Sequence, residues 1–250
     1  MRITTTPVLM IAASTLAASA FAQSTQAPST VTRTVVAATK LPSVVEAPIY
    51  FRALHVSVPP RQTTTLSVAN GILYQISGST EISAGGEPRA LRTGDGLFVA
   101  AGKTASLTAG SDEPSNVLYF LLAPAQDRDQ PAATAPAIVK ELYRTAAPIP
   151  DLKPGSYDLN LTRITFPART PSNPPHHRSG AALYYIISGL GTNTIEGNPE
   201  TKGPGALVYE PFSLVHQWGN TGDVPFTFLA FNINPEGIAA VLQGSPSKGD

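Results

Sequence analysis

Three of the four histidines of this 250-residue chain lie in two short segments of its C-terminal half, where they could hold a metal ion or a small ligand. His176 and His177 are adjacent, and His216 lies in the segment EPFSLVHQWGN, from Glu210 to Asn220. Imidazole nitrogens are common ligands of divalent transition metals. The turn glycine Gly205, a short strand, a proline corner and one inward histidine suit a small β-barrel whose mouth binds such a ligand.

The adjacent pair limits how many imidazoles can meet in one place. Neighbouring side chains on a regular strand point to opposite faces, so one of His176 and His177 is expected inside the barrel and the other outside. A β-bulge could turn both inward. Two imidazoles and water can hold a divalent ion, but three or four protein ligands are usual. Glu210 could turn inward as a carboxylate ligand or lie at the rim. We take His176, His177 and His216 as the candidate metal ligands.

Three further residues are candidate ligand-binding groups. Arg178 shares a strand face with His176 and would place a fixed cation at the pocket, which suits a carboxylate-bearing ligand. Trp218 lies two residues beyond the C-terminal histidine and shares its face. Tyr185 and its neighbour Tyr184 could line a pocket for a flat ligand or pack into the core. We take Arg178, Tyr185 and Trp218 as the ligand-binding candidates.

Residues 1–22 read as an export signal. Arg2 supplies a positive start, an uncharged and mostly apolar run covers residues 7–20, and the sequence AFA at residues 20–22 is typical of a signal-peptide cleavage site. The chain contains no cysteine, so neither a lipid-modified cysteine nor a disulfide can form. We expect cleavage after Ala22, a periplasmic or secreted location, and no stable membrane insertion after the signal is removed.

Composition narrows the fold class and the partners. The formal net charge is zero and charged residues make up 14% of the chain, without a basic block, which disfavours nucleic acid as a partner. Residues 23–43 are rich in Ser, Thr, Ala and Pro and are predicted to be a disordered linker. In the remainder, short β-branched and aromatic segments alternate with Gly, Pro, Asn and Asp. This pattern indicates an all-β fold of antiparallel strands.

An internal repeat sets the number of domains. YQISG at residues 74–78 aligns with YIISG at residues 185–189 at an offset of 111 residues (185 − 74 = 111), and the same offset aligns Arg52 with Arg163. A repeat this long exceeds solenoid periods and indicates two whole barrels. We expect a first, degenerate barrel over residues 44–124, a connection over 125–155, a second barrel with the histidine site over 156–238 and a C-terminal tail over 239–250.

The expected strands follow from apolar alternation and from turn residues. In the first barrel they cover residues 49–56, 63–68, 71–77, 79–84, 96–100, 105–108 and 116–122. In the second barrel they cover residues 157–166, 181–188, 191–195, 206–209, 214–218 and 226–233. A segment of the connection, residues 137–144, could be a short helix or an edge strand. Tight turns that need a positive φ are expected at four glycines: Gly78, Gly94, Gly189 and Gly205.

With these features in place, the second half of the chain resembles a cupin. The segment GALVYEPFSLVHQWGN resembles the second cupin motif, G-x5-P-x-G-x2-H-x3-N. The motif positions are filled, in order, by Gly205, Pro211, Ser213 in place of the inner glycine, His216 and Asn220. The resemblance covers about residues 52–236 as two copies, so the chain is similar to exported bacterial bicupins. It implies two tandem antiparallel β-barrels of the jelly-roll, or double-stranded β-helix, type.

The first cupin motif, G-x5-H-x-H-x3,4-E-x6-G, is matched in part by PPHHRSGAALYYIISG. Counting back from its final glycine puts the glutamate position at Ala182. The two histidine positions become His176 and Arg178 in one permitted spacing, or Pro175 and His177 in the other. Neither spacing supplies both histidines of a cupin metal site.

In the first barrel, the repeat offset replaces the candidate ligands by residues that cannot coordinate a metal. His216 maps to Ala105, and the adjacent histidines map to Thr65 and Leu66. The first barrel is therefore expected to bind no metal.

Two functions follow from these features. The first is an exported cupin-domain protein that binds a small organic ligand in the C-terminal barrel. The alternative is a metal-dependent enzyme, dioxygenase-like or isomerase-like by resemblance, that holds one divalent transition metal (Fe, Mn, Ni or Zn) with His176 or His177 and His216. A homodimer is left open.

Overall fold

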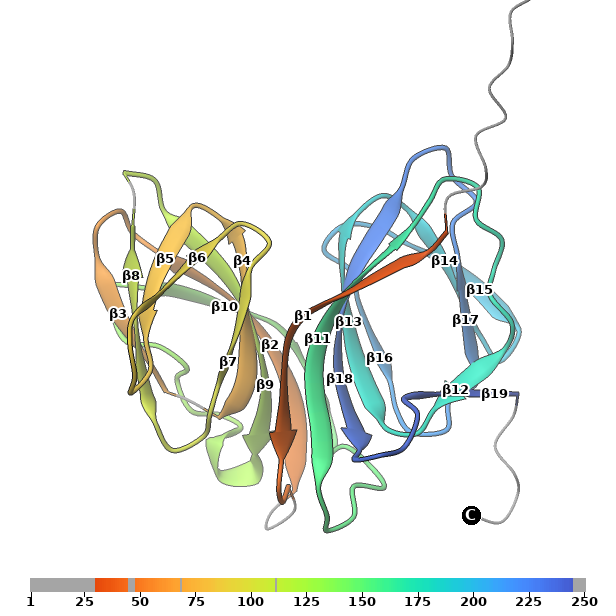
Figure 1. The fold of residues 1–250 in the computed structure, drawn as a ribbon, viewed down its shortest axis with the longest axis horizontal. Coiled ribbons are helices and arrows are strands. Elements are labelled where there is room, and N and C mark those ends of the chain that lie inside the picture. The colour runs from red at the N-terminus through yellow and green to blue at the C-terminus, as the bar shows by residue number, and fades with distance from the viewer. Residues whose placement is uncertain (1–29, 45–47, 68, 111, 245–250) are drawn as a thin grey trace, which may run out of the picture.

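A computed structural model of the chain describes residues 30–44, 48–67, 69–110 and 112–244. In these residues the strands form four antiparallel sheets, and the only helical element described is a single 3-10 turn, η1 (Ala125–Asp127). The sheets pair into two barrels that follow one another along the chain (Figure 1). The expected all-β fold of two tandem antiparallel barrels is confirmed.

The first barrel consists of two sheets that enclose an apolar core. One sheet has the strand order β10 (Ile138–Arg144), β2 (Ile49–Val58), β9 (Ser115–Pro124), β4 (Asn70–Ser77) and β7 (Gly96–Val99). The other has the order β3 (Thr63–Ser67), β8 (Thr104–Ala109), β5 (Ser79–Ser83) and β6 (Arg89–Arg92). Leucine, valine and alanine side chains fill the space between them.

The second barrel repeats this plan with a different interior. Its larger sheet has the order β1 (Thr32–Leu41), β11 (Tyr157–Phe166), β18 (Phe226–Pro235), β13 (Ala181–Ser188) and β16 (Leu207–Glu210). The other has the order β15 (Asn198–Lys202), β14 (Gly191–Ile195), β17 (His216–Gly219), β12 (His176–Arg178) and β19 (Val241–Gln243). Aromatic side chains dominate the apolar part of its core.

The two barrels reproduce the sequence repeat strand by strand. β4, β7 and β9 begin and end 111 residues before β13, β16 and β18 (181 − 70, 207 − 96 and 226 − 115). One short strand departs from this offset, because His176 pairs with His216 whereas Leu66 pairs with Ala105. The structural counterpart of His176 is therefore Leu66, not Thr65 as the ungapped offset predicts.

Two glycines of the repeat occupy the turns that precede β5 and β14. Gly78 has a φ of 70° and Gly189 a φ of 75°, and a Cβ at either position would lie 2.6 Å or 2.3 Å from a backbone carbonyl oxygen. Positive φ and close backbone contact both require glycine. Gly94 and Gly205 also have positive φ, so all four expected turn glycines are confirmed.

The largest departure from the expected fold is the segment predicted to be a disordered linker, residues 23–43. Residues 32–41 of it form β1, which pairs with β11 along the edge of the second barrel. The Ser, Thr, Ala and Pro content of the segment led to the prediction of disorder. Its β-branched residues, in TRTVVAATKL, favour a strand when a partner strand is present. The pairing satisfies backbone groups of β11 that would otherwise form an open sheet edge.

Two other regions expected outside the barrels also add strands to them. The connection, residues 125–155, contains β10, which pairs with β2 of the first barrel, so residues 138–144 form an edge strand and not a helix. The tail, residues 239–250, contains β19, which pairs with β12. The short strands β6, β12 and β15 were not expected from the sequence. The predicted signal peptide lies outside the described residues, and no helix within the described ranges is long and apolar enough to cross a membrane.

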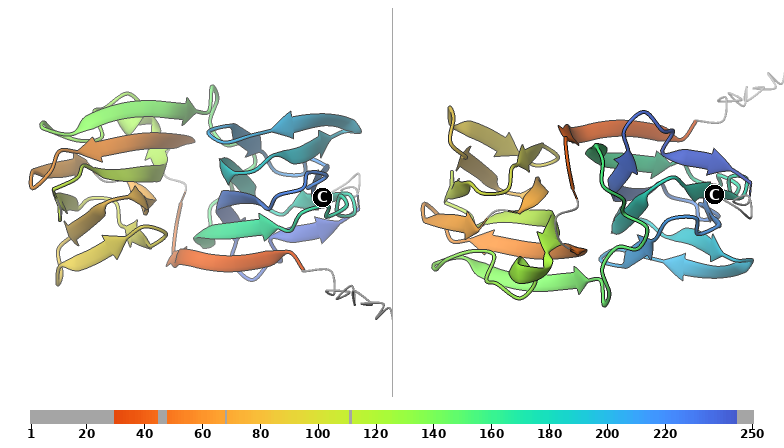
Figure 2. Two further views of the ribbon diagram at one scale, coloured as in Figure 1. Left: turned by 90° about the horizontal axis from the view of Figure 1, so that it is seen from above. Right: turned by 90° about the horizontal axis from the view of Figure 1, so that it is seen from below.

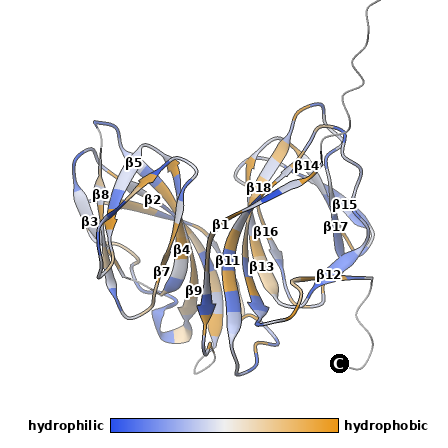
Figure 3. Cartoon of the chain, viewed as in Figure 1, coloured by the Kyte–Doolittle hydropathy of each residue, from blue (hydrophilic) through white to orange (hydrophobic). Residues whose placement is uncertain are grey.

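A third core lies between the barrels, where their larger sheets face each other (Figure 2). Phe51 and Phe120 of the first barrel pack on Phe231 of the second, with ring centroids 5.5 Å and 5.6 Å apart. The strands that meet here carry apolar segments, coloured orange in Figure 3. Because the central strands β4, β9, β13 and β18 bury side chains on both faces, their sequences are nearly continuous apolar runs.

Candidate functional site

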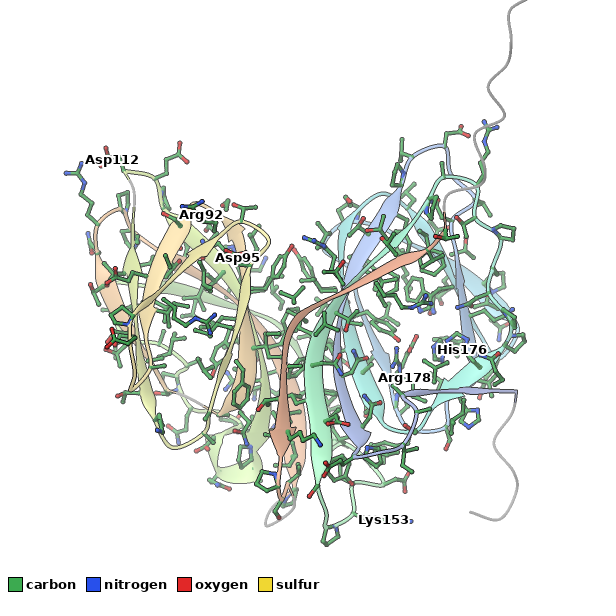
Figure 4. The ribbon with its side chains drawn as sticks, in the orientation of Figure 1. Arg92, Asp95, Asp112, Lys153, His176 and Arg178 are labelled. Atoms are coloured by element: carbon green, nitrogen blue, oxygen red, sulfur yellow. The ribbon has the colours of Figure 1, made fainter. Side chains whose placement is uncertain are left out.

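The interior of the second barrel contains a cavity of about 780 Å³. Residues of β1, β11, β18 and the segment around β19 contribute to its lining. His176, Arg178, Tyr184 and Trp218 line it together with Phe228, and Figure 4 labels the first two inside the barrel. Aromatic walls with a few polar groups are typical of small-molecule sites.

Two histidines face each other across strands β12 and β17. His176 and His216 form a cross-strand pair with ring centroids 4.2 Å apart. The Nδ1 of His176 lies 2.9 Å from the carbonyl oxygen of Pro174, and the Nδ1 of His216 lies 3.0 Å from that of Leu214. A carbonyl only accepts, so Nδ1 donates in both rings, and Nε2 of a neutral His176 ring carries a lone pair.

A carboxylate enters the same region from β16. Glu210 is fully buried and pairs across the strands with Ala182, the position at which the first cupin motif has its glutamate. Its Oε1 accepts a hydrogen bond from Trp218 Nε1 at 2.9 Å, and its Oε2 accepts one from Arg178 Nε at 3.1 Å. The same Oε2 lies 2.9 Å from His216 Nε2, without the geometry of a hydrogen bond. The neighbouring strand thus supplies the carboxylate that the motif position lacks.

Arg178 completes this group of buried polar side chains. Its Nε and Nη2 donate to the hydroxyl of Tyr184, the former at 2.8 Å, and its guanidinium carbon lies 5.2 Å from the centre of that ring. Nη1 makes no hydrogen bond with the described residues and, unlike Nε2 of His216, is not sealed from the cavity. We call His176, Arg178, Glu210 and His216 the polar cluster.

The electrostatics of the polar cluster favour an ion pair between Arg178 and Glu210. Burial alone would raise the pKa of the Glu210 carboxyl, but the adjacent His216 ring and Arg178 guanidinium outweigh it and hold the pKa below its usual range. Burial lowers the pKa of His176, and the neighbouring His216 lowers it further, against a raising contribution from the Pro174 carbonyl. His176 is therefore neutral at pH 7, and its Nε2 accepts hydrogen bonds.

Not all the predicted site residues reach the cavity. His177 points away from it, and its Nδ1 bonds to the carbonyl of Gly244 at 2.9 Å. Tyr185 lies on the opposite face of β13 from Tyr184 and packs against the core between the barrels. Strand alternation therefore brings together His176, Arg178, His216 and Trp218, and leaves His177 and Tyr185 outside.

Some cavity residues gave no signal in the sequence. Asn160 and Asn232 form a cross-strand pair, and the Nδ2 of Asn232 donates to Asn160 Oδ1 at 2.8 Å. Both line the cavity. Polar residues that alternate with leucines, as in DLNLTRITF, normally indicate a solvent-facing strand surface. Here that surface faces the cavity, which only the three-dimensional structure shows.

Asn220, the last residue of the second cupin motif, has a structural role. Its Nδ2 donates to the carbonyls of Phe166, Pro167 and Val224, and its Oδ1 accepts from the backbone of Gly222. These bonds satisfy the backbone of a buried turn. Asn220 thus holds the end of β17 in place and does not contact the cavity.

The polar cluster does not suit a divalent metal ion. No three His, Asp or Glu side chains converge as a metal-binding group in the part of the chain that the structure describes. Both oxygens of Glu210 accept hydrogen bonds, and a guanidinium cation lies at the oxygen nearest His216. A metal bound there would face a fixed positive charge, and the protein would offer it two imidazoles.

Comparison with known proteins identifies the family of the second barrel. Residues 162–232 match the family model described as "Cupin domain". Comparison with curated proteins gives no match.

Solved structures share the fold at low sequence identity. A mutant of salicylate 1,2-dioxygenase from Pseudoaminobacter salicylatoxidans in complex with gentisate has a TM-score of 0.52 and 12% identity, covering 73% of this chain and 68% of that one. Bacillus subtilis oxalate decarboxylase, described for its Mn(II) centres, has a TM-score of 0.53 and 14% identity, covering 82% and 78%. AerE from Microcystis aeruginosa has a TM-score of 0.52 and 15% identity, covering 76% and 95%.

At these identities the structural likeness shows the fold alone. The family model, the two-barrel fold and the second cupin motif agree with one another. The second barrel therefore contains a cupin domain, over the residues 162–232 that the family model matches.

Proposed function

We propose that the protein binds a small organic molecule in the cavity of its second barrel, without a metal ion. The observation that carries this proposal is the cavity itself, about 780 Å³ in volume and lined by aromatic side chains and by His176 and Arg178 of the polar cluster. Pockets of this size and composition are the usual sites of small ligands. Among the described residues of the first barrel, apolar side chains fill the corresponding interior, and the cavity found there is smaller, about 340 Å³.

The free polar atoms define the chemistry of the ligand. Arg178 Nη1 is a donor without a partner, and His176 Nε2 is an acceptor without a partner among the described residues. A ligand would pair a carboxylate or another acceptor with Nη1 and a hydroxyl donor with Nε2. Trp218 and Phe228 supply flat walls for an aromatic ring. Gentisate, an aromatic hydroxy acid bound in one of the similar structures, has these groups and serves as the first probe.

The alternative function, a metal-dependent dioxygenase-like or isomerase-like enzyme, has one observation in its favour. The Nδ1 atoms of His176 and His216 donate to backbone carbonyls, which is how proteins commonly orient metal-binding histidines. However, His177 points away and Glu210 is engaged by Arg178 and Trp218. The arrangement therefore supports a binding protein over this enzyme.

Isothermal titration calorimetry with gentisate and p-hydroxybenzoate, on protein treated with a chelator, tests the proposed function. We expect saturable binding of one ligand per chain. Ala38 on β1 lines the cavity, whereas Thr34 on the same strand does not, so Ala38→Phe should abolish binding and Thr34→Phe should leave it unchanged. Equal binding by both variants, or binding only after Fe or Mn is added, would refute the proposal.

We also propose that the protein is exported. The apolar run and the AFA sequence before residue 23 support a signal peptide that is cleaved after Ala22. Expression of the full chain in a Gram-negative bacterium, followed by N-terminal sequencing of the periplasmic fraction, should give a mature protein that starts at Gln23. An uncleaved product confined to the cytoplasm would contradict this.

A further inference from the structure

Arg178 occupies the place of a histidine in the first cupin motif. The structure selects the spacing in which the motif positions are 176, 178 and 182, because His176 and Arg178 are inside the barrel and His177 is outside. Position 178 is the second histidine position of that spacing. Its side chain is 6% exposed and lies within the polar cluster.

The carboxylate of the polar cluster is present, but it comes from another strand. Ala182 stands at the motif's glutamate position, and Glu210 is its cross-strand neighbour on β16. The Oε2 of Glu210 lies 2.9 Å from His216 Nε2, and His216 pairs with His176. Two imidazoles and one carboxylate are therefore neighbours, without converging on one point in the part of the chain that the structure describes, and the fourth position holds an arginine.

The guanidinium takes over the electrostatic role that a metal ion would have. A buried carboxylate needs a positive partner, and Arg178 Nε supplies it at 3.1 Å from Glu210 Oε2. Arginine stays protonated at all accessible pH values. A divalent ion that approached this oxygen would meet a fixed positive charge at a buried position, where repulsion is less screened than in bulk water.

We propose that Arg178 is the residue that excludes divalent metals from the second barrel, by serving as its built-in cation. Replacing this one side chain by histidine would then complete a set of three imidazoles and one carboxylate. Such a set matches the three or four protein ligands usual for a tight site. The inference rests on the metal-free part of the proposed function and not on the ligand: failure of gentisate to bind leaves it intact, whereas metal binding by the wild type would overturn it.

The test is titration with Co(II), followed by the visible absorption of the bound ion, together with elemental analysis of protein purified without a histidine tag. Wild type should bind less than about a tenth of an equivalent, and Arg178→His about one equivalent. The matched control is Arg52→His. Arg52 is a similarly buried arginine whose Nε pairs with Glu141 at 2.7 Å in the first barrel, but it has no histidine across the strands. This control should bind no more Co(II) than wild type.

A second variant protects the test against loss of folding. Arg178→Gln removes the charge and leaves both imidazoles and the carboxylate in place, so it should bind more Co(II) than wild type and less than Arg178→His. Two results would overturn the inference. One is stoichiometric Co(II) in the wild type that is lost in His216→Ala. The other is Co(II) binding no higher than wild type in every variant at position 178 that circular dichroism shows to be folded.

Discussion

The two barrels share one backbone plan and have opposite interiors. Five positions of the second barrel interior carry polar or aromatic residues: Glu210, His216, Trp218, Tyr184 and Asn232. At the matching positions of β7, β8, β4 and β9, 111 residues earlier, the first barrel has apolar residues, in the same order Val99, Ala105, Leu107, Leu73 and Leu121. The apolar set belongs to the core of the first barrel, whereas Tyr184, Trp218 and Asn232 of the second line its cavity. The comparison teaches that the fold does not dictate a site, because side chains on the same strands determine it.

The comparison implies that the first barrel cannot tolerate the charge that the second barrel accommodates. Val99 is 1% exposed and packs in the apolar core of the first barrel, whereas Glu210 pairs with Arg178. Val99→Glu should therefore cost about 5 kcal/mol or more, enough to unfold the first barrel, because an unpaired carboxylate is buried. Urea unfolding followed by circular dichroism measures this. A cost under about 1 kcal/mol would show that the two interiors are alike.

Within the second barrel, breaking the ion pair between Arg178 and Glu210 should have the next largest effect on the free energy of unfolding. Glu210→Gln leaves the buried guanidinium without its counter-ion and should lower the free energy of unfolding by about 3 kcal/mol. The matched change in the first barrel is Glu141→Gln, which removes the partially exposed partner of Arg52 and should cost under about 1 kcal/mol. If Glu210→Gln and Glu141→Gln lowered the free energy of unfolding equally, the Arg178–Glu210 pair would be no more important for stability than the partially exposed pair in the first barrel.

A smaller effect should appear in the pH dependence of thermal stability. The pKa of His176 is lowered in the folded protein by burial and by the neighbouring His216, and the groups that face it are His216, Glu210 and Arg178. The folded pKa lies below the unfolded value of about 6.5. The contribution of His176 to the free energy of unfolding is therefore complete above that value and is lost as the pH falls through the folded pKa. Thermal unfolding should therefore show a falling Tm below about pH 6.5.

His176→Gln isolates this contribution, because His55 also has a pKa lowered by burial and titrates in the same range. The variant should show a shallower loss of Tm on acidification than the wild type. An unchanged slope would assign the pH dependence to other groups.

The smallest expected effect concerns the corner before β17. Ser213 has a φ of 62°, and its counterpart in the first barrel, 111 residues earlier, is Gly102 with a φ of 73°. The first barrel thus keeps the glycine of the cupin motif, and the second keeps only its backbone conformation. Ser213→Gly should raise stability by up to about 1 kcal/mol, and Gly102→Ser should lower it by a similar amount. In urea unfolding, a lower stability of Ser213→Gly or a higher stability of Gly102→Ser would contradict the correspondence of these two positions.

The sequence predicted the elements whose signals are local. Alternation and turn residues placed β11, β13 and β14 at their observed bounds, and the repeat identified the second barrel as a copy of the first. The segment around β1 gave no such signal, because its partner β11 is far along the chain and only sheet pairing reveals it. The three-residue strand β12 is too short for any periodicity.

The candidate site was predictable only in part, for reasons of geometry. The spacing of His216 and Trp218 indicated a shared inward face, and the structure has both inward. Adjacent His176 and His177 left two spacings open, and pairing of His176 with His216 decides between them. The position of Glu210 beside Ala182 depends on the register of β13 against β16, which no sequence motif encodes.

The central claim, that the second barrel binds a small organic molecule without metal, is tested most directly by tryptophan fluorescence. The chain has a single tryptophan, Trp218, and it lines the cavity, so its emission reports on that cavity alone. Titration of chelator-treated protein with p-hydroxybenzoate, corrected for light absorption with free N-acetyltryptophanamide, should give a saturable change at one ligand per chain. A change in emission that appears only after Mn(II) or Fe(II) is added would contradict binding without a metal ion.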